Sequence, residues 1–257
     1  MKAERLKQME EYISKREFVT VEELSRQFSV HKNTVRSDIN ELVEKGIVEK
    51  KYGGVSCKSY SLPTSFEERE EINVNSKRII GRLAVSYLQE NDIIFVDAGT
   101  TTLMLFEDLS LLPEKLTVIT NSLSVINRCF QKPQYNVYAL PGKLERQMNS
   151  FASFETIESI KSYNIQKAFM GVRGISQNGD LSSASAIDAR LKEATLQNSR
   201  QKILMAEAEK INHPAMLNFA SLSMLDTWIC DRATEEAVEL AQRLQVKFVS
   251  PQKESQF

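Results

Sequence analysis

Residues 93–102 read IIFVDAGTTT, an apolar run that ends at Asp97 and opens directly into a turn of small residues. A strand that stops at a Gly/Thr turn before a helix is a common way to bind an anion. The first turn of the helix presents free backbone N–H groups and the positive end of the helix dipole. Gly99 allows close approach of the backbone. Hydroxyl donors come from three consecutive residues, Thr100, Thr101 and Thr102. The stretch therefore predicts a strand, a turn and a helix around a phosphate site.

The sequence around this stretch alternates between two patterns. Apolar runs occupy 93–96, 116–120, 136–140, 167–172, 202–206, 227–230 and 247–249. Helical patterns occupy 76–90, 101–109, 122–130, 153–162, 186–199 and 234–243. Strand–helix alternation of this kind predicts a doubly wound α/β domain, in which a mostly parallel sheet carries helices on both faces.

Ligands of such sheets bind at the carboxyl ends of the strands, so the residues at predicted strand ends matter. These are Asp97 with Gly99 to Thr102, Thr120 and Asn121, Gly142 and Lys143, Gly171 and Arg173, and Glu207 with Lys210. They are far apart in the sequence, and the topology predicts that they converge on one rim of the sheet.

The first sixty residues follow a different plan. Leu6, Met9 and Ile13 have helical spacing, and Thr20-x-x-Glu23 is a capping-box signature for a second helix through residue 28. A third helix has Val35, Ile39, Leu42 and Val43 on one face and Gly46 as its C-terminal stop. The stretch IVEKKYGGVS, residues 47–56, then reads as two short strands. Three helices followed by a hairpin predict a winged helix-turn-helix, although a small helical domain with an edge hairpin would share the pattern.

The exposed face of the third helix and the hairpin are the candidate DNA-binding surface. The stretch 31–58 carries six Lys or Arg and four Asp or Glu, a local excess of two positive charges. The candidate DNA-binding residues are Lys32, Asn33, Thr34, Arg36, Ser37 and Asn40 of the helix, and Lys50, Lys51, Tyr52, Gly53 and Gly54 of the wing. The helix would read the major groove, and the wing would lie along the backbone.

Composition limits the classes of protein. The 257 residues have 42% hydrophobic and 26% charged side chains and a net charge of −1, so a DNA-binding surface must be local. The charged N-terminus, the lack of an apolar run of ~20 residues and three scattered cysteines indicate a cytoplasmic protein without a membrane span, a metal site or a cofactor. We expect a DNA-binding domain at 1–58, a linker with Pro63 at 59–75 and a sensor domain at 76–257.

The two halves together resemble the DeoR family of bacterial transcriptional regulators. The resemblance covers residues 3 to 245 and includes VTVEELSRQFSVHKNTVRSDINELVEKGIVEKKYGGV, DAGTTT, VITNS, ALPGKL, KAFMGVRGI and LKEATL…ILMAEAEK in this order. It implies a sensor domain whose fold resembles ribose-phosphate isomerase, which binds a phosphorylated sugar without catalysis. It also implies repression of a carbohydrate-utilisation operon. Within the family, KNTVRSDIN and EKKYGGV most resemble the inositol-catabolism repressors of Gram-positive bacteria.

The resemblance also assigns residues. Asp97 and Gly99 to Thr102 match the family's phosphate loop, and Thr120 and Asn121 match its Thr-Asn strand end. Gly142 matches the first glycine of a usual Pro-Gly-Gly, Lys192 matches the lysine of a helix that faces the pocket, and Lys210 matches the lysine of a usual Asp-x-x-Lys. In the DNA-binding half, Thr34 and Arg36 match the recognition helix, and Gly53 and Gly54 match the wing. Three residues depart from the family pattern. Lys143 stands where the family usually has a second glycine, and Glu207 stands where it usually has an aspartate. Ser37 stands where the recognition helix usually has a second arginine. The first two changes would alter the effector pocket, where Lys143 would add an anion contact, and Ser37 removes one charge from the DNA face.

Two other functions fit part of this pattern. A sugar-phosphate isomerase or hydrolase would use Asp97, Glu207 or Lys192 as acid or base, but it would not need a winged helix. A regulator could instead sense a nucleotide or a coenzyme A derivative, although neither GxGxxG nor a Walker sequence is present. The expected partners are double-stranded operator DNA, a phosphorylated sugar and further copies of the chain in a dimer or tetramer. The sequence does not identify the sugar or the operator.

Overall fold

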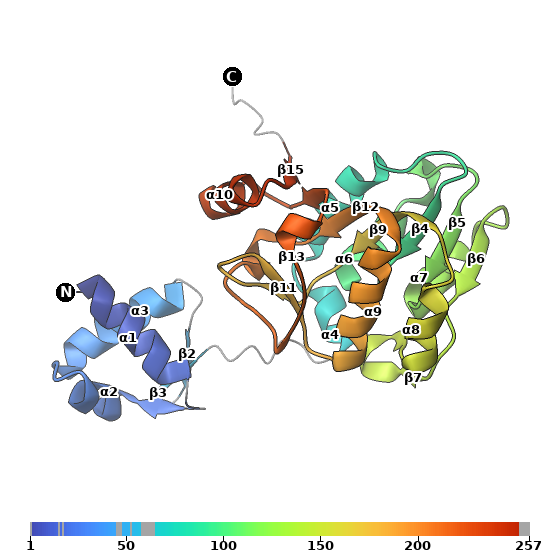
Figure 1. Ribbon diagram of the computed structural model, residues 1–257. Coiled ribbons are helices and arrows are strands. Elements are labelled where there is room, and N and C mark those ends of the chain that lie inside the picture. The colour runs from blue at the N-terminus through green and yellow to red at the C-terminus, as the bar shows by residue number, and fades with distance from the viewer. Residues whose placement is uncertain are drawn as a thin grey trace, which may run out of the picture. The chain divides into compact units, whose positions relative to one another are not determined.

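The computed structural model describes residues 2–14, 16, 18–44, 48–51, 53–57 and 65–251. The chain forms two compact units, Met1–Thr64 and Ser65–Phe257 (Figure 1). Each unit has a hydrophobic core of its own.

The first unit contains three helices and a small antiparallel sheet. The helices are α1 (Lys2–Ser14), α2 (Val21–Gln27) and α3 (Lys32–Glu44), and the strands β1 (Val19–Thr20), β2 (Val48–Lys51) and β3 (Gly54–Cys57) lie in the order β1-β3-β2. Thr20 and Glu23 form the predicted capping box at the start of α2. The predicted winged helix-turn-helix is confirmed, with β1 as a third strand that the sequence pattern did not indicate.

A buried ion pair joins two of these helices. The Asp38 carboxylate, 1% exposed, accepts hydrogen bonds from Arg5 Nε at 2.7 Å and Nη2 at 3.1 Å. Asp38 lies on α3 among Val35, Ile39 and Leu42, which fill the core as predicted. The pair fixes α1 against the inner face of α3 and leaves the opposite face of α3 to solvent.

The second unit is built on a seven-stranded parallel sheet. Its strands are β4 (Ile93–Val96), β5 (Thr117–Thr120), β6 (Asn136–Ala139), β9 (Ile165–Met170), β12 (Ser199–Met205), β14 (Thr227–Ile229) and β15 (Lys247–Val249), in the order β15-β14-β12-β9-β4-β5-β6. All seven strands lie in predicted apolar runs or overlap them. The pairs Val96↔Thr120 and Val96↔Phe169 align the carboxyl ends of β5 and β9 with that of β4.

Helices cover both faces of this sheet (Figure 1). They are α4 (Phe66–Glu71), α5 (Val74–Val85), α6 (Thr100–Leu103), α7 (Leu123–Cys129), α8 (Phe154–Ile160), α9 (Ala186–Gln197) and α10 (Glu235–Arg243). Along β4, Phe95 joins one hydrophobic cluster while Ile94 and Val96 join the other. Because successive side chains of a strand point to opposite faces, the two clusters are the two sides of one sheet. The predicted doubly wound α/β fold is confirmed.

Two predicted segments differ from the structure. The helical pattern at 101–109 is a single turn, α6, followed by the 3-10 turns η1 (Met104–Phe106) and η2 (Leu109–Leu111). Three consecutive β-branched threonines are poor helix formers, and the Asp108 side chain starts a new turn by accepting from Ser110 N. In the predicted linker 59–75, residues 66–71 form α4 with Phe66 buried, and residues 59–64 lie outside the described part.

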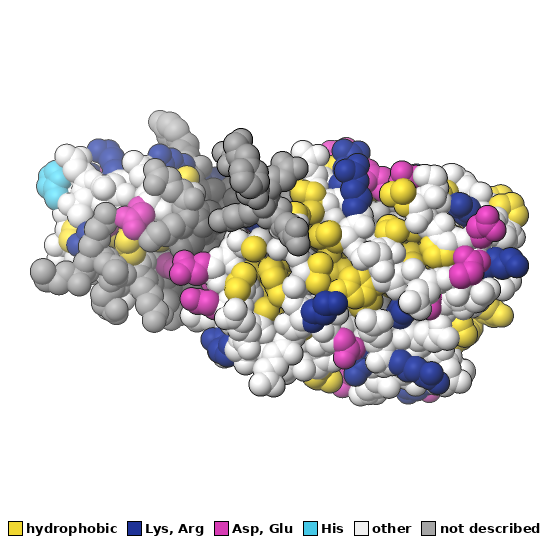
Figure 2. Space-filling view, turned by 90° about the horizontal axis from the view of Figure 1, so that it is seen from above, with side chains coloured by type: hydrophobic (Ala, Val, Ile, Leu, Met, Phe, Trp, Pro, Cys, Tyr) yellow, Lys and Arg dark blue, Asp and Glu magenta, His cyan; other side chains and the backbone are white. Residues whose placement is uncertain are grey.

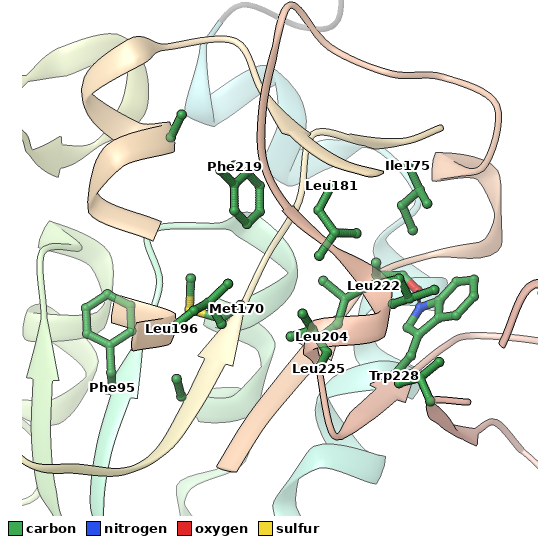
Figure 3. Close-up of a cluster of buried hydrophobic side chains, with 14 of the residues drawn as sticks. Phe95, Met170, Ile175, Leu181, Leu196, Leu204, Phe219, Leu222, Leu225 and Trp228 are labelled. Carbon is green, nitrogen blue, oxygen red and sulfur yellow. Dashed lines mark hydrogen bonds between the residues drawn. The ribbon is translucent and has the colours of Figure 1, made fainter. Parts of the chain in front are cut away.

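A smaller antiparallel sheet lies over one face of the main sheet. It contains β10 (Gly174–Ile175), β11 (Asp180–Ser183) and β13 (Leu217–Ser221), and a separate hairpin pairs β7 (Leu144–Glu145) with β8 (Ser150–Phe151). Figure 3 shows the apolar side chains of the small sheet in the same cluster as those of the main sheet; they are Ile175, Leu181, Phe219, Leu204 and Trp228. The small sheet therefore covers α9, which carries Lys192.

Candidate functional site

The exposed face of α3 carries most of the predicted DNA-binding side chains. Five of the six predicted helix residues are exposed, namely Lys32, Asn33, Arg36, Ser37 and Asn40, whereas Thr34 is half-buried. Arg36 Nη1 donates to Asn33 Oδ1 at 3.4 Å, and Lys32 forms an ion pair with Glu22 of α2. The face is polar, with its cations in the first two turns.

The hairpin of β2 and β3 completes this surface. Lys50, Lys51 and Gly53 are exposed, and Gly54 is buried; Tyr52 lies outside the described residues. A groove of about 520 Å³ runs between α3 and the hairpin, lined by Arg36, Asn40, Lys50, Lys51, Gly53 and Gly54 together with Val21, Glu22 and Ile39. The structure thus brings predicted residues from the helix and from the wing onto one concave surface.

Charge is distributed differently on the second unit. On the face seen in Figure 2, Lys and Arg side chains are interspersed with Asp and Glu among hydrophobic side chains. This face therefore has no continuous basic surface of the kind that binds a phosphate backbone.

A buried ion pair lies at the carboxyl end of β4 in the second unit. Asp97 Oδ2 pairs with Lys192 Nζ of α9 and accepts from Gly171 N at 2.9 Å, and Lys192 Nζ also donates to Gly171 O at 3.1 Å. Asp97 and Lys192 are 2% and 5% exposed. A Cβ at position 171 would lie 3.1 Å from Asp97 Oδ2, so glycine allows the backbone to reach the carboxylate. The ends of β4 and β9 therefore meet as the topology predicted, and Lys192 of α9 joins them.

A second carboxylate shares the same lysine. Asp188 Oδ1 lies 3.8 Å from Lys192 Nζ, and Asp188 Oδ2 accepts from Ser183 Oγ at 2.5 Å. Burial, opposed by Lys192, raises the pKa of Asp188 above its ordinary value. Burial alone would lower the pKa of Lys192, but Asp188 and Asp97 raise it above its ordinary value. Lys192 is therefore a fixed cation between two carboxylates at neutral pH.

Two of the three threonine hydroxyls of the DAGTTT turn, those of Thr101 and Thr102, donate inside the protein. Thr102 Oγ1 donates to Asp97 O at 2.7 Å, and Thr101 Oγ1 donates to Glu207 Oε2 at 3.2 Å. Thr120 Oγ1 likewise donates to Val96 O at 2.6 Å. These hydroxyls hold the strand ends together rather than pointing to a ligand. Since α6 has only four residues, its dipole is also small, and an anion here would need side-chain cations.

Such cations are present around the buried pair. Burial lowers the pKa of Arg69, and the negative charges of Asp188 and Asp97 oppose this. Burial and the charge of Arg69 lower the pKa of Arg173 to about 10. Burial lowers the pKa of Lys210 as well, with Arg173 and Arg69 acting in the same direction and Glu207 opposing. Arg69 thus acts on both other cations and Arg173 acts on Lys210, so positive charge gathers around these half-buried side chains, where an anion would be stabilised.

The remaining predicted residues lie at the neighbouring strand ends. Asn121 follows β5, and its Nδ2 donates to Phe151 O at 3.1 Å. Gly142 has φ +145°, which favours glycine, and lies beside the start of α8. Lys143 is 77% exposed and pairs with Glu145 at 2.8 Å. No contact places Lys143 at the buried pair, and its role in effector binding stays a prediction.

Four residues of this region were missing from the predicted site residues. Asp188 has a sequence signal, since it lies four residues before Lys192 on the same helix. Arg69 has an indirect one, because the capping box of Ser65 and Glu68 marks its helix. Gly171 and Arg173 were noted at a strand end but were not assigned to the site.

No group of three or more metal-ligating side chains occurs among the residues that the structure describes. The helices of the described ranges are all too short or too polar to cross a membrane.

Comparison with known proteins gives matches over most of the chain. Residues 5–60 match the DeoR-like helix-turn-helix domain, and residues 72–232 match the DeoR C terminal sensor domain. The HTH-type transcriptional regulator IolR of Bacillus subtilis is 33% identical over 226 residues, which cover 88% of this chain and 89% of the relative. The glycerol-3-phosphate regulon repressor of Escherichia coli is 28% identical over 221 residues, with 86% and 87% covered.

Solved structures are more distantly similar. Ribose 5-phosphate isomerase A of Methanocaldococcus jannaschii aligns over 54% of this chain and 55% of its own, with 14% identity and a TM-score of 0.39. No functional conclusion depends on a similarity at this level.

Proposed function

The chain belongs to the DeoR family of transcriptional regulators, and from this premise we propose that it represses a carbohydrate-catabolism operon. It leaves its operator when a phosphorylated sugar binds to the second unit. The protein works in the cytoplasm as a homo-oligomer and is not an enzyme.

The first unit supplies the operator contacts. Arg36 and Asn40 of α3 share a groove with Lys50 and Lys51 of the wing, which supports base contacts from the helix and phosphate contacts from the wing. Two copies would place their recognition helices about one turn of DNA apart on a palindrome. Binding through phosphate contacts would weaken steeply with salt.

The observation that carries the effector proposal is the cation cluster beside a buried carboxylate–lysine pair. Arg69, Arg173 and Lys210 are the groups that would hold a phosphate, and Asp97 and Lys192 would face the sugar. The name of the Escherichia coli relative refers to glycerol 3-phosphate, which supports a phosphorylated effector.

The same geometry argues against catalysis. A general base must be able to take up a proton at working pH. Lys192 is held protonated by two carboxylates, and Asp97 is already engaged by Lys192 and Gly171 N. These groups fit a binding role better than that of acid or base.

Fluorescence anisotropy tests this proposal. The full-length protein is bound at fixed salt to DNA from upstream of its own gene, and sugar phosphates and their dephosphorylated forms are added. We expect release by a phosphorylated sugar only. A coupling free energy of about 3 kcal/mol would weaken DNA binding ~150-fold. Tight DNA binding that no phosphorylated compound changes would refute the effector part.

A matched pair of variants locates the effector. Lys210→Met removes a cation of the cluster and should weaken the response ~10–150-fold, as expected for the loss of a charged hydrogen bond. Lys161→Met removes an exposed lysine paired with Glu158 and should leave the response unchanged. Equal responses of the two variants would place the phosphate elsewhere.

A further inference from the structure

Two buried amide oxygens lie at the carboxyl end of β5. In the described part of the chain, Asn121 Oδ1 and Asn149 Oδ1 are buried without a hydrogen-bond partner. Such an acceptor costs free energy in the folded protein unless a donor reaches it. A native structure that keeps two of them in one region therefore suggests that a donor arrives with a ligand.

The orientation of the Asn121 amide follows from its neighbour. Its Nδ2 donates to Phe151 O at 3.1 Å, and a backbone carbonyl can only accept. Turning the amide over would place two oxygens against each other. Oδ1 is therefore the free end of a side chain that is 1% exposed.

Asn149 lies on the adjoining segment. Phe151 N donates to Asn121 O at 2.8 Å and Leu123 N donates to Asn149 O at 3.0 Å, on either side of the bridge between Ser122 and Ser150. Asn121 and Asn149 are thus diagonal neighbours of one antiparallel ladder, roughly 7–8 Å apart. One small ligand could span both amides.

This pair of amides borders the proposed effector site. Val96 and Thr120 are the last paired residues of β4 and β5, and Asp97 and Asn121 are the residues that follow them on these adjacent strands. On the other side, Arg69 Nη2 lies 3.9 Å from the sulfur of Met148, which precedes Asn149. Asn121 is therefore near the carboxylate–lysine pair along the sheet, and Asn149 is next in sequence to a residue that contacts a cation of the cluster.

We propose that Asn121 Oδ1 and Asn149 Oδ1 accept hydrogen bonds from hydroxyl groups of the effector. The effector is then a polyol phosphate whose hydroxyl groups are recognised by these two amides. The inference rests on the proposed function and adds the ligand chemistry. A phosphate dianion has only acceptor oxygens and cannot satisfy an amide oxygen, so the phosphate lies with the cations and the hydroxyls with the amides.

Matched pairs of ligands test the inference on the full-length protein. The probes are ribose 5-phosphate with 2-deoxyribose 5-phosphate and glucose 6-phosphate with 2-deoxyglucose 6-phosphate, and inorganic phosphate is the reference without carbon-bound hydroxyls. Binding is measured by calorimetry for the unchanged protein, Asn121→Ala and Asn136→Ala. Asn136 is an exposed asparagine of β6 and serves as the control.

We expect at least one pair in which loss of a single hydroxyl weakens binding 10-fold or more, because the site's buried acceptor is then left unpaired. In Asn121→Ala this ratio should fall towards one, whereas Asn136→Ala should keep it. The affinity for inorganic phosphate should be the same in all three proteins. The ratio is informative even if Asn121→Ala is less stable, because both members of a pair bind to the same variant.

Three results would overturn the inference. Deoxy compounds that bind as well as their parents would show that water satisfies the amide oxygens. A loss of phosphate affinity in Asn121→Ala that equals the loss of sugar-phosphate affinity would place the phosphate at the amide. In both cases a sugar phosphate could still release DNA, and the proposed function would stand. If no phosphorylated compound binds, the proposed function fails and the inference with it.

Discussion

Replacing Lys192 by methionine should destabilise the second unit more than any conservative change of its partner Asp97. Lys192 is 5% exposed and lies between two carboxylates, Asp97 and Asp188. Methionine has a similar length but leaves both carboxylates without their cation. Asp97→Asn removes only one of the two charges that Lys192 balances, and Asp188 remains at 3.8 Å from the ammonium group.

The magnitudes follow from what each change leaves buried. Breaking a buried ion pair by removing one partner costs about 3–5 kcal/mol. Asp97→Asn keeps an acceptor for Gly171 N and a compensated lysine, so its cost is that of a weakened charged hydrogen bond, about 1–3 kcal/mol. For a domain of this size the melting temperature falls ~2–4 °C per kcal/mol. Lys192→Met should therefore lower it by roughly 6–20 °C.

The single tryptophan makes the assay specific for one unit. Trp228 is fully buried in the core of the second unit, so its fluorescence reports unfolding of that unit and not of the first. Thermal and urea unfolding of the full-length protein are followed at this signal for the unchanged protein and the two variants. Conservation of the urea m-value would show that the variants unfold from the same compact state.

The dependence on pH distinguishes unpaired charge from lost packing. Burial raises the pKa of Asp188 in the unchanged protein, and Lys192 opposes this rise, so Lys192→Met should raise it further. A raised carboxyl pKa means that the folded state binds more protons than the unfolded state above pH ~4, and stability then increases as pH falls. The stability gap between Lys192→Met and the unchanged protein should narrow from pH 7 to pH 5. A constant gap, or an Asp97→Asn variant that is the less stable of the two, would refute the reasoning.

Three further predictions concern other parts of the chain. Arg36→Ala should weaken operator binding by about 1–3 kcal/mol in an anisotropy titration, whereas Arg16→Ala, after α1, should not. Gly142→Ala should cost about 1–3 kcal/mol in urea unfolding, because φ is +145° and the added methyl group would overlap the start of α8. Burial lowers the pKa of Lys77 to about 8 in the folded protein. Between pH 8 and ~10 the unfolded chain therefore binds one more proton than the folded chain, and the free energy of unfolding rises with pH. Lys77→Met should flatten this rise, measured as the urea midpoint followed by Trp228 fluorescence.

The fold was predictable because burial dictates a simple pattern in each element. Strands of a parallel sheet are covered on both faces and read as continuous apolar runs, as in IIFV and LTVIT. The antiparallel β10, β11 and β13 gave no such signal. β10 has only two residues, and β11 reads DLSS, in which the buried Ser182 donates its hydroxyl to Gly174 O. A polar strand held by a specific hydrogen bond cannot be recognised from hydrophobic periodicity.

Within the candidate site, topology predicted positions better than roles. Asp97, Gly171 and Glu207 follow parallel strands, and their approach follows from strand order. The hydroxyls of Thr101 and Thr102 were expected to serve a ligand, yet they donate to Glu207 and to Asp97 O. A threonine beside a strand end has several acceptors within reach, and only the packed structure decides which one it takes.

Arg69 lies on a helix whose start carries a local sequence signal. The sequence SFEERE, residues 65–70, contains the Ser-x-x-Glu pattern of a capping box and an aromatic residue at the first helical position. The polar composition and Pro63 favoured a linker that enters a charged helical stretch. The buried ring of Phe66 docks this helix, and Lys77 Nζ donates to Ile72 O at 2.5 Å just after its end. Arg69 of α4 donates from Nε to Ser65 O at 3.3 Å, and the charges of Asp188 and Asp97 oppose the lowering of its pKa by burial. The segment that follows the DNA-binding unit in the chain thus carries a cation of the proposed effector site, and an anion bound there would act directly on the first helix of the sensor.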